Sequence, residues 1–128
     1  MAQREGFDIV ILDTAGRLSI DQVKVFADGI PRSRTAWVSE PYDDCSHGSL
    51  TIAGATDAER VEEFRAIVAA AASRGWQIGT HCTGDATISA FLDAVEATVT
   101  SHLRHYVIHG DLVQADDLPR LARLGMGL

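Results

Sequence analysis

Short apolar runs alternate with longer amphipathic stretches along most of the chain. The runs are rich in Val, Ile and aromatic residues, and the first two end at turns that contain Gly. Such runs are typical of strands that are buried in a sheet. We therefore predict four strands, at residues 7–13, 23–28, 76–81 and 106–109.

Three of the amphipathic stretches have the apolar spacing of one helix face. The first helix is expected at residues 58–73, where Thr56 and Glu59 have the spacing of a capping box and Gly75 provides the stop. The last stretch contains Pro119, which a helix tolerates in its first turn. The apolar positions are Val61, Phe64, Val68 and Ala71 in the first helix, Ile88, Phe91, Val95 and Val99 in the second, and Leu118, Leu121 and Leu124 in the third.

Strand and helix alternate in the sequence, and this order is typical of parallel βαβ units. The predicted fold is therefore α/β, with a mainly parallel sheet of about four strands and three helices. Residues 29–56 interrupt the alternation and are expected to form a functional loop, with a brief extended piece at residues 50–53. A chain of 128 residues has the length of one domain, so residues 1–128 are expected to fold as one unit.

Composition narrows the range of partners and compartments. With a formal net charge of −7 the chain offers no cluster of Lys and Arg for phosphates, so nucleic acid is not expected as a partner. The sequence has neither a signal-peptide pattern nor an apolar stretch of membrane-spanning length, which predicts a cytoplasmic protein that does not enter a membrane. Cys45 and Cys82 lack the spacing of a zinc or redox motif and are expected to be reduced thiols.

Two histidines have positions that suit a metal site. His81 and His109 each end a predicted strand, about one βαβ repeat apart. The carboxyl ends of parallel strands share one edge of the sheet, where α/β proteins bind ligands. Neutral imidazole is a common metal ligand, but a histidine at a strand end is also often only capped or solvated. The spacing alone leaves both interpretations open.

Several motifs in order resemble the middle of family 3 amidohydrolases, over about residues 22–128. They are VKVFADG at 23–29, RTA at 34–36, PY at 41–42, HCTGDA at 81–86 and RHYVIHGDLV at 104–113, followed by a DxxRLARLG helix. Members of that family are metal-dependent (β/α)8-barrel hydrolases that act on amide-type C–N bonds. The resemblance implies that this part of the chain corresponds to a partial barrel.

The same resemblance implies three metal ligands and a cofactor, zinc or another divalent metal. Lys24 would be a carbamylated lysine, because an ammonium group has no lone pair, and His81 and His109 would be ligands on the next two strands. For Lys24, a solvated cation that pairs with Asp28 or another carboxylate is an equal alternative. Asp85 would either orient His81 or act as a helix N-cap.

The sequence departs from the family pattern at the remaining ligand positions. The family needs a His-x-His pair on its first strand and an Asp on its eighth, but the first histidine here is His47, inside the loop at 29–56. The chain also ends at Leu128, where the family would begin its seventh strand. We therefore expect an incomplete site that retains no metal and has no catalytic activity.

A second resemblance covers residues 4–21. The sequence REGFDIVILDTAGRLSID is similar to the segment of signal-recognition-particle GTPases that reaches Mg²⁺ and the terminal phosphate of the nucleotide. The similarity implies that Asp13 would approach the metal and Gly16 the phosphate. No GxxxxGK[ST] loop for the phosphates is present, so a strand followed by a turn is the favoured interpretation.

The two resemblances meet near residue 21, where the composition is not that of a linker. We infer a recombined chain, in which a GTPase-like strand segment at 1–21 joins an amidohydrolase-like barrel fragment at 22–128. The added strand would cover a free edge of the sheet in the parallel direction. A sheet of this size cannot close as a barrel, so we expect a homo-oligomer formed through free sheet edges or an exposed apolar face.

Three functional hypotheses follow. The main one is a folded recombinant or truncated domain without catalysis. The alternative is a metal-dependent amidohydrolase whose site is completed by oligomerisation, with water as the nucleophile and the loop at 29–56 in contact with the substrate. A nucleotide-binding module is the third.

Overall fold

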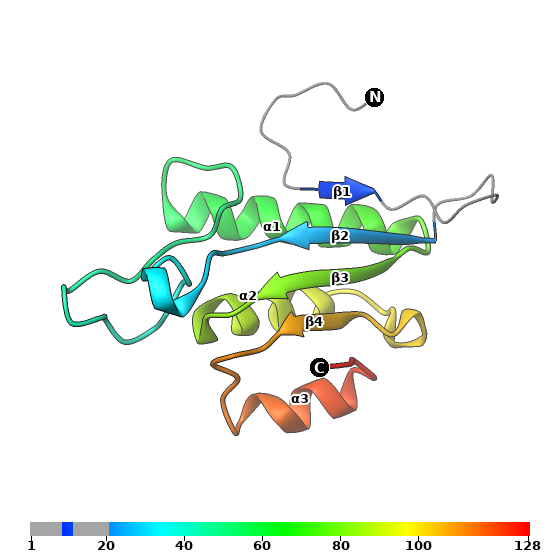
Figure 1. Cartoon of the computed structure of the whole chain (residues 1–128). Coiled ribbons are helices and arrows are strands. Elements are labelled where there is room, and N and C mark those ends of the chain that lie inside the picture. The colour runs from blue at the N-terminus through cyan, green and yellow to red at the C-terminus, as the bar shows by residue number, and fades with distance from the viewer. Residues whose placement is uncertain (1–8, 12–20) are drawn as a thin grey trace.

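Four strands form a single sheet in the order β1-β2-β3-β4 (Figure 1). The structure is a computed structural model that describes residues 9–11 and 21–128. β2, β3 and β4 run parallel to one another, so the predicted α/β fold with a mainly parallel sheet is confirmed. The strands are β1 (Ile9–Ile11), β2 (Gln22–Phe26), β3 (Gln77–Cys82) and β4 (Tyr106–His109).

The direction of β1 differs from the prediction, because β1 pairs antiparallel with β2. Ile9 lies opposite Val25, and Ile11 lies opposite Val23. The strand covers the edge of β2 as expected, but in the reverse direction. A parallel crossover usually needs a dozen or more residues, and only residues 12–21 separate the two strands. The rest of the strand predicted at 7–13 lies outside the described residues.

The described residues form three α-helices, α1 (Asp57–Ser73), α2 (Asp85–Glu96) and α3 (Asp117–Arg123). The predicted capping box of α1 is present. The Thr56 hydroxyl accepts a hydrogen bond from the Glu59 amide, and the Glu59 carboxylate accepts one from the Thr56 amide, both at 3.2 Å. At the other end Gly75 has φ = +71°, and the Trp76 amide donates to the Ala71 carbonyl. Gly75 therefore ends α1 in the left-handed conformation that suits glycine.

Some apolar positions differ from the expected helix faces and strands. Val99 lies beyond the end of α2 and is 97% exposed, and Leu118 of α3 is 49% exposed. Residues 50–53 form no strand, although Leu50 and Ile52 are buried in the core. Within the described part of the chain, none of the helices has the length and apolar character needed to cross a membrane.

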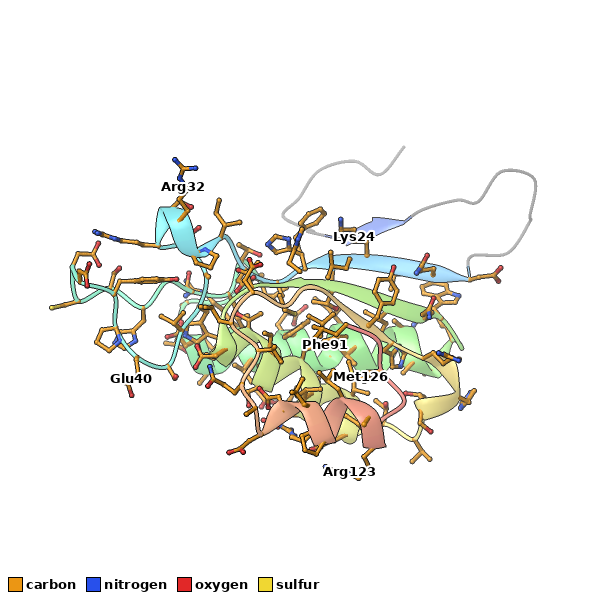
Figure 2. All side chains as sticks on the ribbon, turned by 60° about the horizontal axis from the view of Figure 1, so that its bottom comes forward. Lys24, Arg32, Glu40, Phe91, Arg123 and Met126 are labelled. Atoms are coloured by element: carbon orange, nitrogen blue, oxygen red, sulfur yellow. The ribbon has the colours of Figure 1, made fainter. Side chains whose placement is uncertain are left out.

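The hydrophobic core lies between the helices and one face of the sheet. Val23 and Val25 of β2 are buried in this core. Phe64 of α1 and Phe91 of α2 stack in the same core, with ring centroids 5.8 Å apart. Figure 2 shows Phe91 on the helix side of the sheet and Lys24 on the other side. The face that carries Lys24 is left open by the helices, and we call it the open face.

The loop at 29–56 follows β2 at the carboxyl edge of the sheet (Figure 1). It contains a short 3-10 helix, Pro31–Ser33, and is otherwise irregular; a second 3-10 helix, Ser101–Leu103, precedes β4. Backbone hydrogen bonds of 2.9 Å hold the loop in place, from the Val38 amide to the His47 carbonyl and from the Thr51 amide to the Ala27 carbonyl. The predicted long connection is therefore irregular but firmly attached to the end of β2.

Candidate functional site

His81 and His109 lie side by side at the carboxyl edge of the sheet, as predicted. His81 is the penultimate residue of β3, and His109 is the last residue of β4. Their rings meet edge to face, with centroids 4.8 Å apart and planes at 75°. His81 is buried, whereas His109 is exposed. The two strands therefore bring two imidazoles together at a place that solvent reaches.

His109 leaves regular strand geometry to reach His81. Its partner in register on β3 is Cys82, which is buried in the core on the helix side. In a regular strand His109 would point to the same side, because partners in register face the same way. Its φ of +80° is uncommon for a residue other than glycine, and Gly110 continues the turn with φ = +64°. Strain of about 1–3 kcal/mol is typical of such a residue and is frequent at functional sites.

A backbone contact decides which nitrogen of His81 carries the proton. Nε2 lies 2.8 Å from the carbonyl oxygen of Gly29. A carbonyl oxygen can only accept, so Nε2 must donate, and in the neutral ring Nδ1 then has the free lone pair. Nδ1 is therefore the atom of His81 that can bind a cation.

Lys24 and Phe26 extend the row of side chains along the open face. Pairing in register places Lys24 opposite Gly79 and Phe26 opposite His81. The Lys24 Nζ lies 4.6 Å from the centre of the Phe26 ring, and the ring centroids of Phe26 and His81 are 5.7 Å apart. Within the described ranges, no ion pair joins Lys24 to Asp28. The alternative of a solvated cation that pairs with another carboxylate stays a prediction.

Asp28 is a buried carboxylate just beyond the end of β2, and its side chain has no exposed surface. It accepts hydrogen bonds from the backbone amides of Thr83 at 3.0 Å and Gly84 at 2.8 Å. The Thr87 hydroxyl at 2.8 Å and the Trp37 amide at 3.3 Å are further donors. The positive end of α2 also favours a carboxylate at this position. Asp28 therefore joins β2, the β3–α2 turn and the loop at 29–56.

Asp85 has neither of the two roles predicted for it. It is the first residue of α2, and the N-cap position is occupied by Gly84. Its carboxylate accepts hydrogen bonds from the Ser39 amide at 3.1 Å and from the Ser39 hydroxyl, which holds the loop against α2. The amide of Gly84 is satisfied by Asp28, which comes from a different strand.

Asp28 and Gly29 are the site residues that the sequence interpretation missed. Both lie in the VKVFADG motif, and a carboxylate directly after a parallel strand lies at the edge where ligands bind. That signal indicates a site residue. It does not identify the partners, because Thr83 is 55 residues away from Asp28 in the sequence.

Two other ionisable side chains near this edge stay protonated at neutral pH. Burial, followed by the charge of Asp28, raises the pKa of the Cys82 thiol. Burial, followed by the charges of Asp28 and Asp85, raises the pKa of the Tyr42 phenol. A nucleophilic cysteine acts as a thiolate, so Cys82 does not fit that role.

The described residues hold part of the donor set that a catalytic metal needs. His81 and His109 supply two neighbouring imidazoles, and Lys24 lies on the adjacent strand. Across residues 9–11 and 21–128, no group of three or more His, Cys, Asp or Glu side chains could hold a metal ion. Catalytic zinc usually takes three protein ligands, so the two imidazoles fit a metal as a partial set. Asp13 and Gly16, the predicted nucleotide contacts, lie outside the described residues.

Comparisons with known proteins agree with this arrangement. The Bacillus subtilis (strain 168) protein named "Putative amidohydrolase YtcJ" is 29% identical over 108 residues, which are 83% of this chain and 19% of that protein. Crystal structures of uncharacterized metal-dependent hydrolases from Pyrococcus furiosus and Pyrococcus horikoshii OT3 each match with a TM-score of 0.64 and 30% identity. Each match covers 80% of this chain and 20% of the hydrolase, so the chain spans about one fifth of its relatives' length. Residues 10–128 match the amidohydrolase family, and the chain belongs to that family.

Proposed function

We propose that this chain supplies central metal ligands of a metal-dependent hydrolase of amide-type C–N bonds. The observation that carries the proposal is the edge-to-face contact of His81 and His109 at the carboxyl edge of the sheet. A regular strand would separate the two rings, and the positive φ of His109 brings them together. Membership of the amidohydrolase family supports the class of reaction.

In this proposal His81 would hold the metal through Nδ1, and His109 would be the second ligand. Lys24 would be a third once its neutral amine has added CO₂ and lost a proton to give a carbamate. A second copy of the chain completes the donor set by oligomerisation. A divalent metal, zinc for example, would polarise the amide carbonyl and lower the pKa of an attacking water. The chain itself fixes the ring of His81 through Gly29 and covers one side of that ring with Phe26.

The loop at 29–56 is proposed to contact the substrate. A pocket of about 300 Å³ lies between this loop and the segments that follow β3 and β4. Pockets of this size accept small molecules, and polar side chains in them fix the orientation of the ligand. The lining includes Glu40, Tyr42, Asp85, Leu112 and Gln114.

The test is metal content and turnover of the purified full chain. After incubation with zinc and removal of the excess, we expect elemental analysis to find bound metal in the unmodified protein. His81→Ala and His109→Ala should each lower the metal content by about tenfold or more, because each removes a ligand of a partial set. His102→Ala is the matched control, since His102 is an exposed histidine outside the site.

Hydrolysis of N-acyl amino acids and other amides, measured by amine release, then separates two candidate functions. Turnover that is lost in the His81 and His109 variants would support the hydrolase. Bound metal without turnover would favour the domain without catalysis. No bound metal in the unmodified protein, or equal metal in all variants, would contradict the proposal.

A further inference from the structure

We propose that Asp28 is a positioning residue that fixes the tautomer and orientation of His81. The inference adds a residue to the proposed site. It rests on the proposed function, which assigns His81 as a metal ligand. Asp28 touches neither metal nor substrate in this proposal. It acts through the Gly29 carbonyl, which accepts the Nε2 proton of His81.

Asp28 lies too far from His81 to hold the ring directly. Its Oδ1 is 3.8 Å from the His81 Nε2, beyond the usual length of a hydrogen bond. The residue that follows it, Gly29, provides the contact instead. Asp28 therefore holds the backbone that holds the imidazole.

The groups around the Asp28 side chain are hydrogen-bond donors, which an ionised carboxylate suits best. The groups that hydrogen-bond to it among the described residues are donors, namely the amides of Trp37, Thr83 and Gly84 and the hydroxyl of Thr87. An ionised carboxylate has acceptor sites only and can satisfy all of them. Asn has nearly the same shape, but its NH₂ group would face some of these donors and leave them unpaired.

The Gly29 carbonyl is fixed from two further sides. The Thr83 hydroxyl donates to it at 2.7 Å and also contacts the Asp28 carboxylate. The backbone of Gly29 packs closely on Thr35, so that a Cβ at this position would lie 2.0 Å from the Thr35 hydroxyl oxygen. The carbonyl oxygen therefore has little freedom, and it leaves His81 one favourable ring orientation. Nδ1 then faces away from the backbone with its lone pair free.

The experiment compares Asp28→Asn with Asp85→Asn in the full chain without metal. Asp85 begins α2, directly after the Thr83 and Gly84 amides that bond to Asp28, but its own carboxylate bonds to Ser39, so it is the matched control for loss of a carboxylate. Long-range ¹H–¹⁵N spectra at about pH 8.5, where imidazole is neutral, report the tautomer of each histidine. His81→Gln assigns the signal of His81. We expect one Nε2-protonated form in the unmodified protein and in Asp85→Asn, and a mixture of both tautomers in Asp28→Asn.

Zinc affinity gives a second measurement. We expect Asp28→Asn to weaken binding by about tenfold or more, as is typical when the partner of a ligand is removed, and Asp85→Asn to leave it unchanged. If Asp28→Asn does not fold, Thr87→Val removes one donor to the carboxylate and should produce a smaller shift of the same His81 signal.

A folded Asp28→Asn protein in which His81 keeps a single Nε2-protonated form would overturn the inference. An equal change in Asp85→Asn would also overturn it, because the effect would then follow from the loss of any carboxylate near the β3–α2 turn. The tautomer measurement needs no metal. If the unmodified protein binds no zinc, the proposed function is contradicted. The tautomer spectra still decide whether Asp28 positions His81.

Discussion

His105 is buried ahead of β4, and both of its ring nitrogens are in use. Nδ1 accepts the amide proton of Ile78 at 3.1 Å, so Nε2 carries the ring proton and donates it to the Thr100 hydroxyl at 3.0 Å. A second proton could enter only at Nδ1, where it would break the bond to Ile78. Burial, followed by the charge of His102, lowers the pKa of His105 below its ordinary value of 6.5.

This lowered pKa predicts that acid destabilises the fold. Below about pH 6.5 the unfolded chain binds a proton at His105 that the folded chain does not take up, so stability falls as the pH drops toward the lower folded pKa. Urea unfolding between pH 8 and pH 5.5 should show this loss. We expect His105→Gln to reduce the dependence of the free energy of unfolding on pH. His102→Gln, at an exposed position, should keep most of that dependence. If the free energy of unfolding depends on pH equally in His105→Gln and in the unmodified protein, another group is responsible.

At the level of residues, the sequence predicted that His81 and His109 lie together at one edge of the sheet, but not the contacts that orient their rings. His81 and His109 were found because each ends a strand, and strand ends follow from the local apolar pattern. Strand alternation alone would have placed His109 on the helix side. The bond of His81 to Gly29 joins residues 52 positions apart in the chain, and no local pattern contains that information.

The start of α1 is the element where a local signal acts most directly. Thr56 and Glu59 satisfy each other's backbone amides, and the first turn also contains Asp57. We expect Thr56→Ala to lower the free energy of unfolding by about 1 kcal/mol, because one amide of the first turn loses its partner. Thr56→Ser keeps the hydroxyl and is the control. Equal losses in the two variants, measured by urea denaturation, would argue that the methyl group of Thr56 and not its hydroxyl is important.

At the level of elements, the sequence predicted the ends of helix α1 better than the direction of strand β1. The capping box and Gly75 placed both ends of α1 because these signals lie within a few residues of one another. The direction of β1 depends on the length of its connection to β2 and on which edge is free, and a run of apolar residues reports neither. The helix face predicted for α2 included Val99 and was too long, since α2 ends at Glu96. Apolar spacing alone does not mark the end of a helix.

In the part of the chain that the structure describes, the helices lie on one face of a largely parallel sheet, whereas parallel sheets are usually covered on both faces. Both outer parallel strands already have neighbours. β1 covers the edge of β2, and Gly127 bridges to Tyr106 and donates to the His105 carbonyl beside β4. We therefore predict that copies of this chain associate through the open face rather than through the edges of β2 and β4. The inference that residues 1–21 derive from a recombination event stays a prediction.

Association through the open face can be tested at Phe26. This residue is 36% exposed and lies between Lys24 and His81, in the row where a second copy would complete the proposed metal site. We expect sedimentation equilibrium to show a concentration-dependent dimer. Phe26→Lys should raise its dissociation constant by about tenfold or more, because it removes apolar contact and places a charge beside Lys24. Val99 is an exposed apolar residue that follows α2, and the Val99→Lys variant should dimerise like the unmodified protein. A monomer at every concentration, or equal dissociation constants for the two variants, would mean that the open face is not where copies of this chain meet.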